Sequence, residues 1–170
     1  NYEEAISKVG VIVENPEMYK FMTGYKNLVH FARMHEGVTK ERIDEVIRQV
    51  GLEKRIHEKV STYSLGMRQR LGLAQALLHR PKFLILDEPF SGLDPVNKDL
   101  LKHAILLLKE RGTTILFSSH QMENVEELCD HLCILKRGKS LFAGSLLDLK
   151  KQYGKVKLRV RTNTTASELA

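Results

Sequence analysis

The stretch that decides the expected fold is Phe83-Leu84-Ile85-Leu86-Asp87-Glu88-Pro89. Four apolar residues in a row predict a strand that is buried on both faces, as in the middle of a parallel sheet. Asp87 and Glu88 then stand at the carboxyl end of that strand, where open α/β sheets bind their ligands. Magnesium prefers such oxygen ligands, and a second acid can polarise a water molecule for attack on a phosphate. The alternative interpretation of the two acids is a polar turn after an ordinary strand.

Strands and helices alternate along the chain after this stretch. The elements that we predict share an apolar stripe or run, and they cover residues 96–111 (helix), 113–118 (strand), 122–129 (helix), 132–135 (strand) and 140–143 (strand). Arg137-Gly138 supplies a hairpin turn between the last two strands. Ser145 then begins a short helix, with Asp148 at the capping-box position. Such alternation predicts an α/β fold built on a parallel sheet.

The chain before this stretch has a different pattern. Val9–Val13 predicts a buried strand, and Pro16 keeps the loop that follows out of a helix. Three amphipathic helical stretches come next, around residues 28–32, from the N-cap Thr39 to Gly51, and from Ser64 to Pro81. We therefore expect a helical subdomain, residues 23–79, inserted into the sheet.

Length and composition fit one compact domain: the chain has 170 residues, of which 42% are hydrophobic. The longest apolar runs are far too short to cross a bilayer, and no cationic, apolar leader opens the chain. We expect a soluble, cytosolic protein with a hydrophobic core of its own.

Positive charge is concentrated near the C-terminal end of the chain. Nine Lys or Arg residues and one acid, Asp148, lie between Lys136 and Arg161, so this segment carries +8 and the rest −2 of the net +6. Such a segment could contact anionic lipid or nucleic acid, but a solvated basic face is the interpretation that we favour. Lys155–Arg161 alternates like a strand, and we expect Thr162–Ala170 to be a loose end.

The two cysteines, Cys129 and Cys133, do not form a disulfide framework. His131 between them makes a metal site conceivable. Their apolar neighbours favour buried free thiols instead.

Three further motifs carry chemistry. In Tyr63-Ser64-Leu65-Gly66-Met67-Arg68-Gln69-Arg70, a serine and a glycine stand where a helix begins, and a helix N-terminus suits a phosphate. An ordinary N-cap serine explains the same pattern. Ser91-Gly92-Leu93-Asp94 follows Glu88 closely, and Ser118-Ser119-His120 ends the next predicted strand. His120 should therefore lie at the same sheet edge as Asp87 and Glu88.

Taken in this order, residues 9 to about 144 resemble the ATPase domain of ATP-binding-cassette (ABC) transporters, and in particular the exporters for sodium, bacitracin or lantibiotics. The resemblance implies a P-loop NTPase-like fold. It also identifies four motifs: the signature at Tyr63–Arg70, the Walker B strand at Leu84–Glu88, the D-loop at Ser91–Asp94 and the switch histidine at His120.

The resemblance further implies the role of each motif in the binding and hydrolysis of ATP with Mg2+. Two such domains would sandwich two ATP molecules, and Ser64, Leu65, Gly66 and Met67 would contact the nucleotide of the partner. Asp87 would position the magnesium, Glu88 would act on the hydrolytic water, and His120 would contact the γ-phosphate. Asp94 would couple the two sites.

Three features depart from the family pattern. The signature usually reads Leu-Ser-Gly-Gly-Gln, and here Leu65 and Met67 replace a glycine and the glutamine. Glu14 stands where the family has a glutamine that reaches magnesium, and an acid can still bind the metal there. The chain also contains no Gly-x-x-x-x-Gly-Lys-Ser/Thr, the Walker A loop that cradles phosphates. A fragment of a full ATPase and a degenerate protein both explain this, and in either case we expect the 170 residues alone to be inactive.

The resemblance predicts the ATP-hydrolysing subunit of a membrane exporter, peripheral on the cytoplasmic face of the membrane. Residues 1–154 would be the ATPase domain, and residues 155–170 would start a C-terminal extension. The insert Thr23–Tyr63 would grip a transmembrane permease subunit, and no nucleic acid is expected. The alternative is a non-transport ABC ATPase that acts on ribosomes or nucleic acid, which the basic segment keeps open. A binding-only scaffold is disfavoured because it has no need of Glu88.

Overall fold

The computed structural model describes residues 2–13 and 16–153. The chain divides into two compact units, residues 1–122 and 123–170, and each is considered by itself. The expected domain boundary at residue 154 stays a prediction, because it falls at the edge of the described residues.

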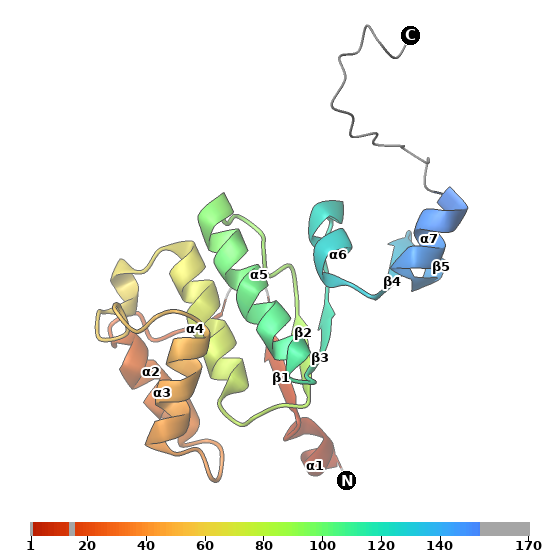
Figure 1. Cartoon of the computed structure of the whole chain (residues 1–170). Coiled ribbons are helices and arrows are strands. Elements are labelled where there is room, and N and C mark those ends of the chain that lie inside the picture. The colour runs from red at the N-terminus through yellow and green to blue at the C-terminus, as the bar shows by residue number, and fades with distance from the viewer. Residues whose placement is uncertain (1, 14–15, 154–170) are drawn as a thin grey trace, which may run out of the picture. The chain divides into compact units, whose positions relative to one another are not determined.

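The first unit contains a parallel sheet of three strands, in the order β1-β2-β3 (Figure 1). The strands are β1 (Val9–Ile12), β2 (Phe83–Leu86) and β3 (Thr114–Phe117), and each lies within the range that the sequence predicted. Their register brings Ile12, Leu86 and Phe117 side by side. All three strands therefore end at one edge of the sheet, and the predicted α/β fold with a parallel sheet is confirmed.

We predicted that the strand Phe83–Leu86 is buried on both faces. Among the described residues this prediction is wrong, because alternate side chains of the strand are only half-buried. Leu84 and Leu86 are fully buried, whereas Phe83 and Ile85 are half-buried. The two residues that pair with Ile85 on the neighbouring strands are more exposed still: Val11 is 51% exposed and Leu116 is 56% exposed. Successive side chains of a strand point to opposite faces, so the burial difference separates the two faces of one sheet. The face that carries Leu84 and Leu86 is therefore buried, and the face that carries Phe83 and Ile85 is more exposed.

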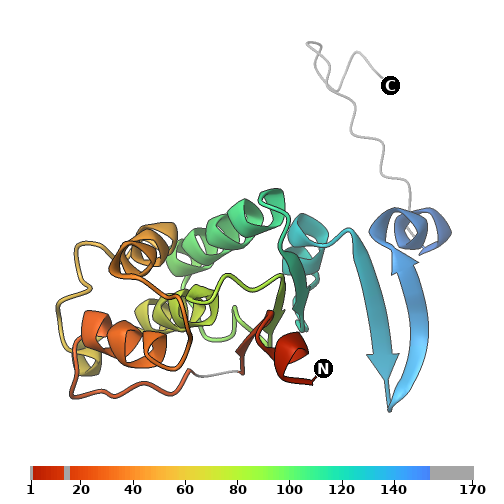
Figure 2. The ribbon, with the colours of Figure 1, turned by 90° about the horizontal axis from the view of Figure 1, so that it is seen from below.

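Helices connect the strands and form the rest of the first unit (Figures 1 and 2). Their bounds are α1 (Tyr2–Ile6), α2 (Gly24–Ala32), α3 (Lys40–Gln49), the 3-10 turn η1 (Val60–Thr62), α4 (Leu65–Leu77) and α5 (Pro95–Glu110). The sequence predicted α2, α3, α4 and α5, but it did not predict α1 or η1. The N-caps are Thr23, Thr39, Ser64 and Asp94, and each accepts a hydrogen bond from a backbone N–H three residues on.

Helix α4 is the centre of the first unit. It packs against α2, α3, α5 and β1. Most of its residues are therefore buried. Two close approaches have no room for a side chain. The backbone of Gly10 lies against the carbonyl of Ala76, and Gly72 lies against the ring of Pro16. The loop after β1 is thereby packed directly on α4.

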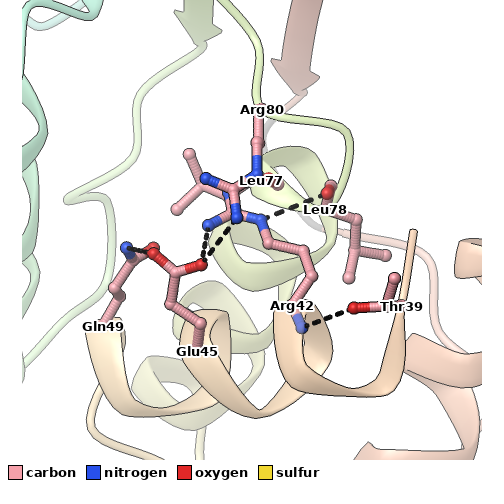
Figure 3. A network of polar contacts seen from close by, with 7 residues as sticks. All are labelled: Thr39, Arg42, Glu45, Gln49, Leu77, Leu78 and Arg80. Carbon is pink, nitrogen blue, oxygen red and sulfur yellow. Dashed lines mark hydrogen bonds and ion pairs between the residues drawn. The ribbon is translucent and has the colours of Figure 1, made fainter. Parts of the chain in front are cut away.

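A buried arginine fixes the C-terminal end of α4 (Figure 3). Arg42 of α3 is 8% exposed, and its guanidinium donates to the carbonyl oxygens of Leu77 (2.5 Å) and Leu78 (3.3 Å). The last carbonyls of a helix have no partner within it, so Arg42 supplies donors that α4 lacks. The same guanidinium pairs with Glu45 at 2.8 Å, and Arg80 binds that carboxylate from the solvent side.

The second unit contains an antiparallel hairpin of β4 (His131–Lys136) and β5 (Lys139–Ser145), flanked by α6 (Met122–Leu128) and α7 (Leu146–Tyr153). Arg137 and Gly138 have φ of 50° and 74°, the pair of positive angles that a tight hairpin turn needs. The predicted cap is present: the Ser145 hydroxyl accepts from the N–H of Asp148 and donates to its carboxylate.

The expectation of buried cysteines is wrong for Cys133, which is exposed, while Cys129 is half-buried. Cys133 lies on a two-stranded hairpin, which leaves one side of each strand open. Among the described residues no cluster of three or more His, Cys, Asp or Glu side chains could hold a metal ion. In the same residues, no helix has the length and apolar character of a membrane span.

Candidate functional site

The acidic residues after β2 and the polar residues after β3 lie next to each other at the carboxyl edge of the sheet. Strand pairing continues one residue beyond each strand: the N–H of Asp87 donates to Ile12 (2.9 Å), and the N–H of Ser118 donates to Leu86 (3.0 Å). Asp87 is exposed and Glu88 is half-buried. The expected meeting of these residues at one edge is therefore confirmed.

Ser118 joins the two acids. Its hydroxyl donates to Asp87 Oδ1 at 2.6 Å and accepts from the backbone N–H of Glu88 at 2.8 Å. This bridging role of Ser118 was not predicted from the sequence. The available signal was its position, since it follows β3 directly, as Asp87 follows β2.

Glu88 and His120 form a contact that orients the carboxylate. Nδ1 of His120 lies 2.9 Å from Oε1 of Glu88. The ring donates to the carboxylate in the tautomer that carries its proton on Nδ1. Glu88 has φ of 43°, in the left-handed region that non-glycine residues rarely occupy, and such strain concentrates at functional sites.

The signature segment forms the start of α4, as predicted. Ser64 is the N-cap, and its hydroxyl accepts from the N–H of Met67 at 3.2 Å, so the N-cap interpretation is confirmed. Gly66 is buried, and Leu65 and Met67 are half-buried. The first N–H groups of a helix have no acceptor inside it, and they create a positive end. The capping role of Ser64 is compatible with phosphate binding at this end.

Asp94 is the N-cap of α5, a structural role that was not predicted from the sequence. Its Oδ1 accepts from the backbone N–H of Asn97 (3.0 Å), and its Oδ2 accepts from the side-chain amide of Asn97 (2.6 Å). The backbone N–H and then the side chain of Asn97 are the main causes that lower the pKa of Asp94. Asp94 is therefore held as an exposed anion at the start of α5.

Glu14, expected near the magnesium, lies outside the described residues, and so does the basic segment 155–161. The predicted site residues that are described fall into two groups. Asp87, Glu88 and His120 meet at the sheet edge. Gly66 of the signature segment contacts Asn97, which in turn binds Asp94.

The chemistry of these groups fits a nucleotide with its magnesium. Asp87 offers hard carboxylate oxygens at an exposed position, which suits a magnesium ion that keeps part of its water shell. The start of α4 offers N–H donors and no acid in its first turn, which suits a phosphate. The oriented Glu88 suits a proton acceptor.

Comparison with known proteins agrees with this chemistry. The family profile described as "ABC transporter" matches residues 1–91. The Bacillus subtilis (strain 168) protein named "Uncharacterized ABC transporter ATP-binding protein YhcH" is 60% identical over 139 residues, which are 81% of this chain and 46% of that protein. "Bacitracin transport ATP-binding protein BcrA" of Enterococcus faecalis is 40% identical over 157 residues, which are 89% of this chain and 51% of that protein.

The fold is also that of a solved structure. CbiO1 from Clostridium perfringens, described as part of the ABC transporter complex CbiONQ, superposes with a TM-score of 0.77 at 24% identity, over 89% of this chain and 62% of that one. The chain spans about half the length of the curated relatives that it matches. The expected resemblance, including that to a bacitracin transport protein, is confirmed: this chain belongs to the ABC transporter family and carries part of its ATP-binding domain.

Proposed function

We propose that the parent protein of this chain is the ATP-hydrolysing subunit of an ABC exporter, and that residues 64–120 carry its hydrolytic and signature motifs. One observation carries the proposal. Glu88, in a strained backbone conformation, is held at its N–H by Ser118 and at its carboxylate by His120. A surface acid after an ordinary strand has no need of such orientation.

The reaction is attack of a water oxygen on the γ-phosphorus of ATP, with cleavage of its bond to the β–γ bridging oxygen. Glu88 accepts a proton from the attacking water, and His120 keeps the carboxylate turned toward it. Magnesium, when bound, neutralises phosphate charge. Asp87 would hold that ion, with or without an intervening water, and the Ser118 hydroxyl fixes one oxygen of Asp87.

A second nucleotide-binding domain is the partner that the signature segment requires. Ser64, Leu65, Gly66 and Met67 form a helix N-terminus, which would contact the γ-phosphate held by that partner. Glu14 would add a carboxylate beside the magnesium, and Asp94 would lie between the two sites. ATP and Mg2+ would thus be bound across a dimer.

A transmembrane permease is the second partner, and it would hold the subunit at the inner face of the membrane. Support comes from BcrA, named for bacitracin transport, and from the transporter complex that contains CbiO1. Within the chain, Pro16, Met18, Lys20, Ser61 and Arg68 line a cavity of about 370 Å³ beside the helical insert. This cavity opens next to the loop that packs on α4, so a permease segment seated there would act on the signature helix.

The test uses the intact subunit, purified with and without the polytopic membrane protein encoded beside it. We expect copurification with that protein and ATP hydrolysis that falls by 10²-fold or more, on the order typical of a lost general base, in Glu88→Gln. ATP binding should survive this substitution. Copurification with ribosomes or nucleic acid instead, or hydrolysis unaffected by Glu88→Gln, would contradict the proposal.

The 170 residues alone should neither bind ATP tightly nor hydrolyse it, because they lack the Walker A lysine and its phosphate cradle. Isothermal calorimetry of this chain with MgATP measures the first property. Micromolar binding would contradict the expectation.

A further inference from the structure

The start of α4 and the loop before α5 interlock through two side chains. Leu65 is the residue that departs from the family's glycine, and its Cδ2 lies 3.0 Å from where a Cβ on Gly92 would stand. Gly92 has φ of 68°, a conformation that favours glycine. The second side chain, Asn97 in the first turn of α5, belongs to none of the four motifs.

Asn97 fills the space between the signature segment and Asp94. A Cβ on Gly66 would lie 2.6 Å from Cβ and 2.5 Å from Oδ1 of Asn97, so the two residues touch with no room for a side chain at 66. On its other side, Asn97 uses its backbone N–H and its Nδ2 to bind both carboxylate oxygens of Asp94.

Arg70, one turn further along α4, binds the remaining polar atom of Asn97. Its Nη2 lies 3.5 Å from Asn97 Oδ1, while its Nη1 donates to the carbonyls of Val50 and Gly51. Arg70 is 8% exposed, so this end of the contact is anchored in the core. Asn97 therefore touches α4 at two successive turns and Asp94 at both oxygens.

We propose that Asn97 is a positioning residue that ties the signature segment Ser64–Met67 to Asp94, so that a nucleotide bound at the start of α4 fixes the place of Asp94 in the same subunit. The inference rests on the proposed function. Close-packed contacts transmit displacement because they cannot be compressed, and Gly66 and Asn97 leave no slack. A shift of α4 would thus move the carboxylate that is bound to Asn97.

The experiment measures ATP hydrolysis by the intact subunit in its transporter. Asn97→Leu keeps the γ-branched shape of the side chain against Gly66 but removes the side-chain bonds to Asp94 and Arg70, so that only the backbone N–H of residue 97 still binds Asp94. Asn97→Asp keeps the shape and replaces the Nδ2 donor with a charge beside Asp94. We expect both to lower kcat between about 10-fold and 100-fold, with KM for ATP within about 3-fold of wild type. If Asn97→Leu does not fold, Asn97→Ala, which cannot clash with Gly66, carries the same measurement.

A double-mutant cycle tests whether Asn97 acts through Asp94, which spatial neighbourhood alone does not establish. The double variant Asp94→Ala/Asn97→Leu should have the kcat of Asp94→Ala alone. Asp99→Asn, on the exposed surface of the same helix, is the control and should leave kcat unchanged. Thermal unfolding of every variant separates loss of the folded subunit from loss of turnover.

Unchanged kcat in Asn97→Leu and Asn97→Ala, with hydrolysis still dependent on Glu88, would overturn the inference and leave the proposed function standing. Additive effects of the Asp94 and Asn97 substitutions would also overturn it, because they would show independent action. Hydrolysis that does not depend on Glu88 would instead overturn the proposed function, and the inference with it.

Discussion

Nδ1 of His120 lies 2.9 Å from the carboxylate of Glu88, although the two residues follow different strands of the sheet. The backbone of Glu88 is bound in turn by the hydroxyl of Ser118, so the residue is held at both ends. Parallel register makes this possible, because Leu86 and Phe117 pair side by side and the chain leaves both strands at one edge.

Ser118→Ala should lower kcat of the intact subunit by about 10-fold to 100-fold, because Asp87 and the N–H of Glu88 lose a shared partner. Steady-state ATPase assays measure the change. Ser119→Ala is a matched control, since that hydroxyl accepts from the N–H of Gln121 instead and its loss should leave kcat unchanged. Equal turnover of Ser118→Ala and wild type would contradict the bridging role.

Arg42→Met should destabilise the subunit by about 1.5–3 kcal/mol, the range for hydrogen bonds to a charged group, because the last carbonyls of α4 lose a buried donor. The hydrogen bond from Arg42 is also the main cause that lowers the pKa of Glu45. Arg80→Met is the control: Arg80 binds the same Glu45 carboxylate, but its side chain is 70% exposed. Such a surface pair is worth about 0–1 kcal/mol. Urea unfolding measures the stability of both variants. Equal losses of stability in Arg42→Met and Arg80→Met would show that the bonds from Arg42 to the end of α4 contribute nothing.

Gly72→Ala should destabilise the subunit, contrary to the gain of about 1 kcal/mol that alanine brings in an exposed helix. Its Cβ would lie 2.7 Å from Cβ of Pro16 and closer still to Cγ, which costs about 1–3 kcal/mol of overpacking. The double variant with Pro16→Gly removes the opposing ring. In the presence of Pro16→Gly, the substitution Gly72→Ala should therefore lower the free energy of unfolding much less than it does when Pro16 is present. Additive losses in this cycle would argue against the contact between α4 and the loop after β1.

His79 should make stability depend on pH. Burial is the main cause that lowers its pKa below the usual 6.5, and His35 and Arg42 add to this, while the hydrogen bond with the Val9 carbonyl opposes it. The unfolded chain therefore binds the proton more readily, so the free energy of unfolding falls as pH falls below about 6.5. His79→Gln should reduce the slope of Tm against pH between about 7.5 and 5.5. His103→Gln, at an exposed position, should leave the slope unchanged. A slope that is the same in all three proteins would exclude His79 as its source.

Local sequence pattern was enough to predict most of the helices and strands, and also the family. Apolar runs ended by Asp87-Glu88 and Ser118-Ser119-His120 predicted parallel strands that end together, and Thr39 and Ser64 predicted where two helices begin. These features are local, since periodicity, caps and breakers act within a few residues. The same local pattern carried the resemblance to ABC ATPases that the comparisons confirm.

The contacts that join the motifs could not be predicted from the sequence, because they depend on how the strands and helices pack. Ser118 reads as one polar loop residue among several, and its bond to Asp87 exists because β2 and β3 are neighbours in register. In the sequence, Asn97 is only one of the first residues of a predicted helix. Its contact with Gly66 exists because α4 and α5 pack against each other. The exposure of the sheet face that carries Phe83 and Ile85 was not predicted, for the same reason. An apolar run records what a strand can bury, whereas the neighbouring elements decide which side chains are buried.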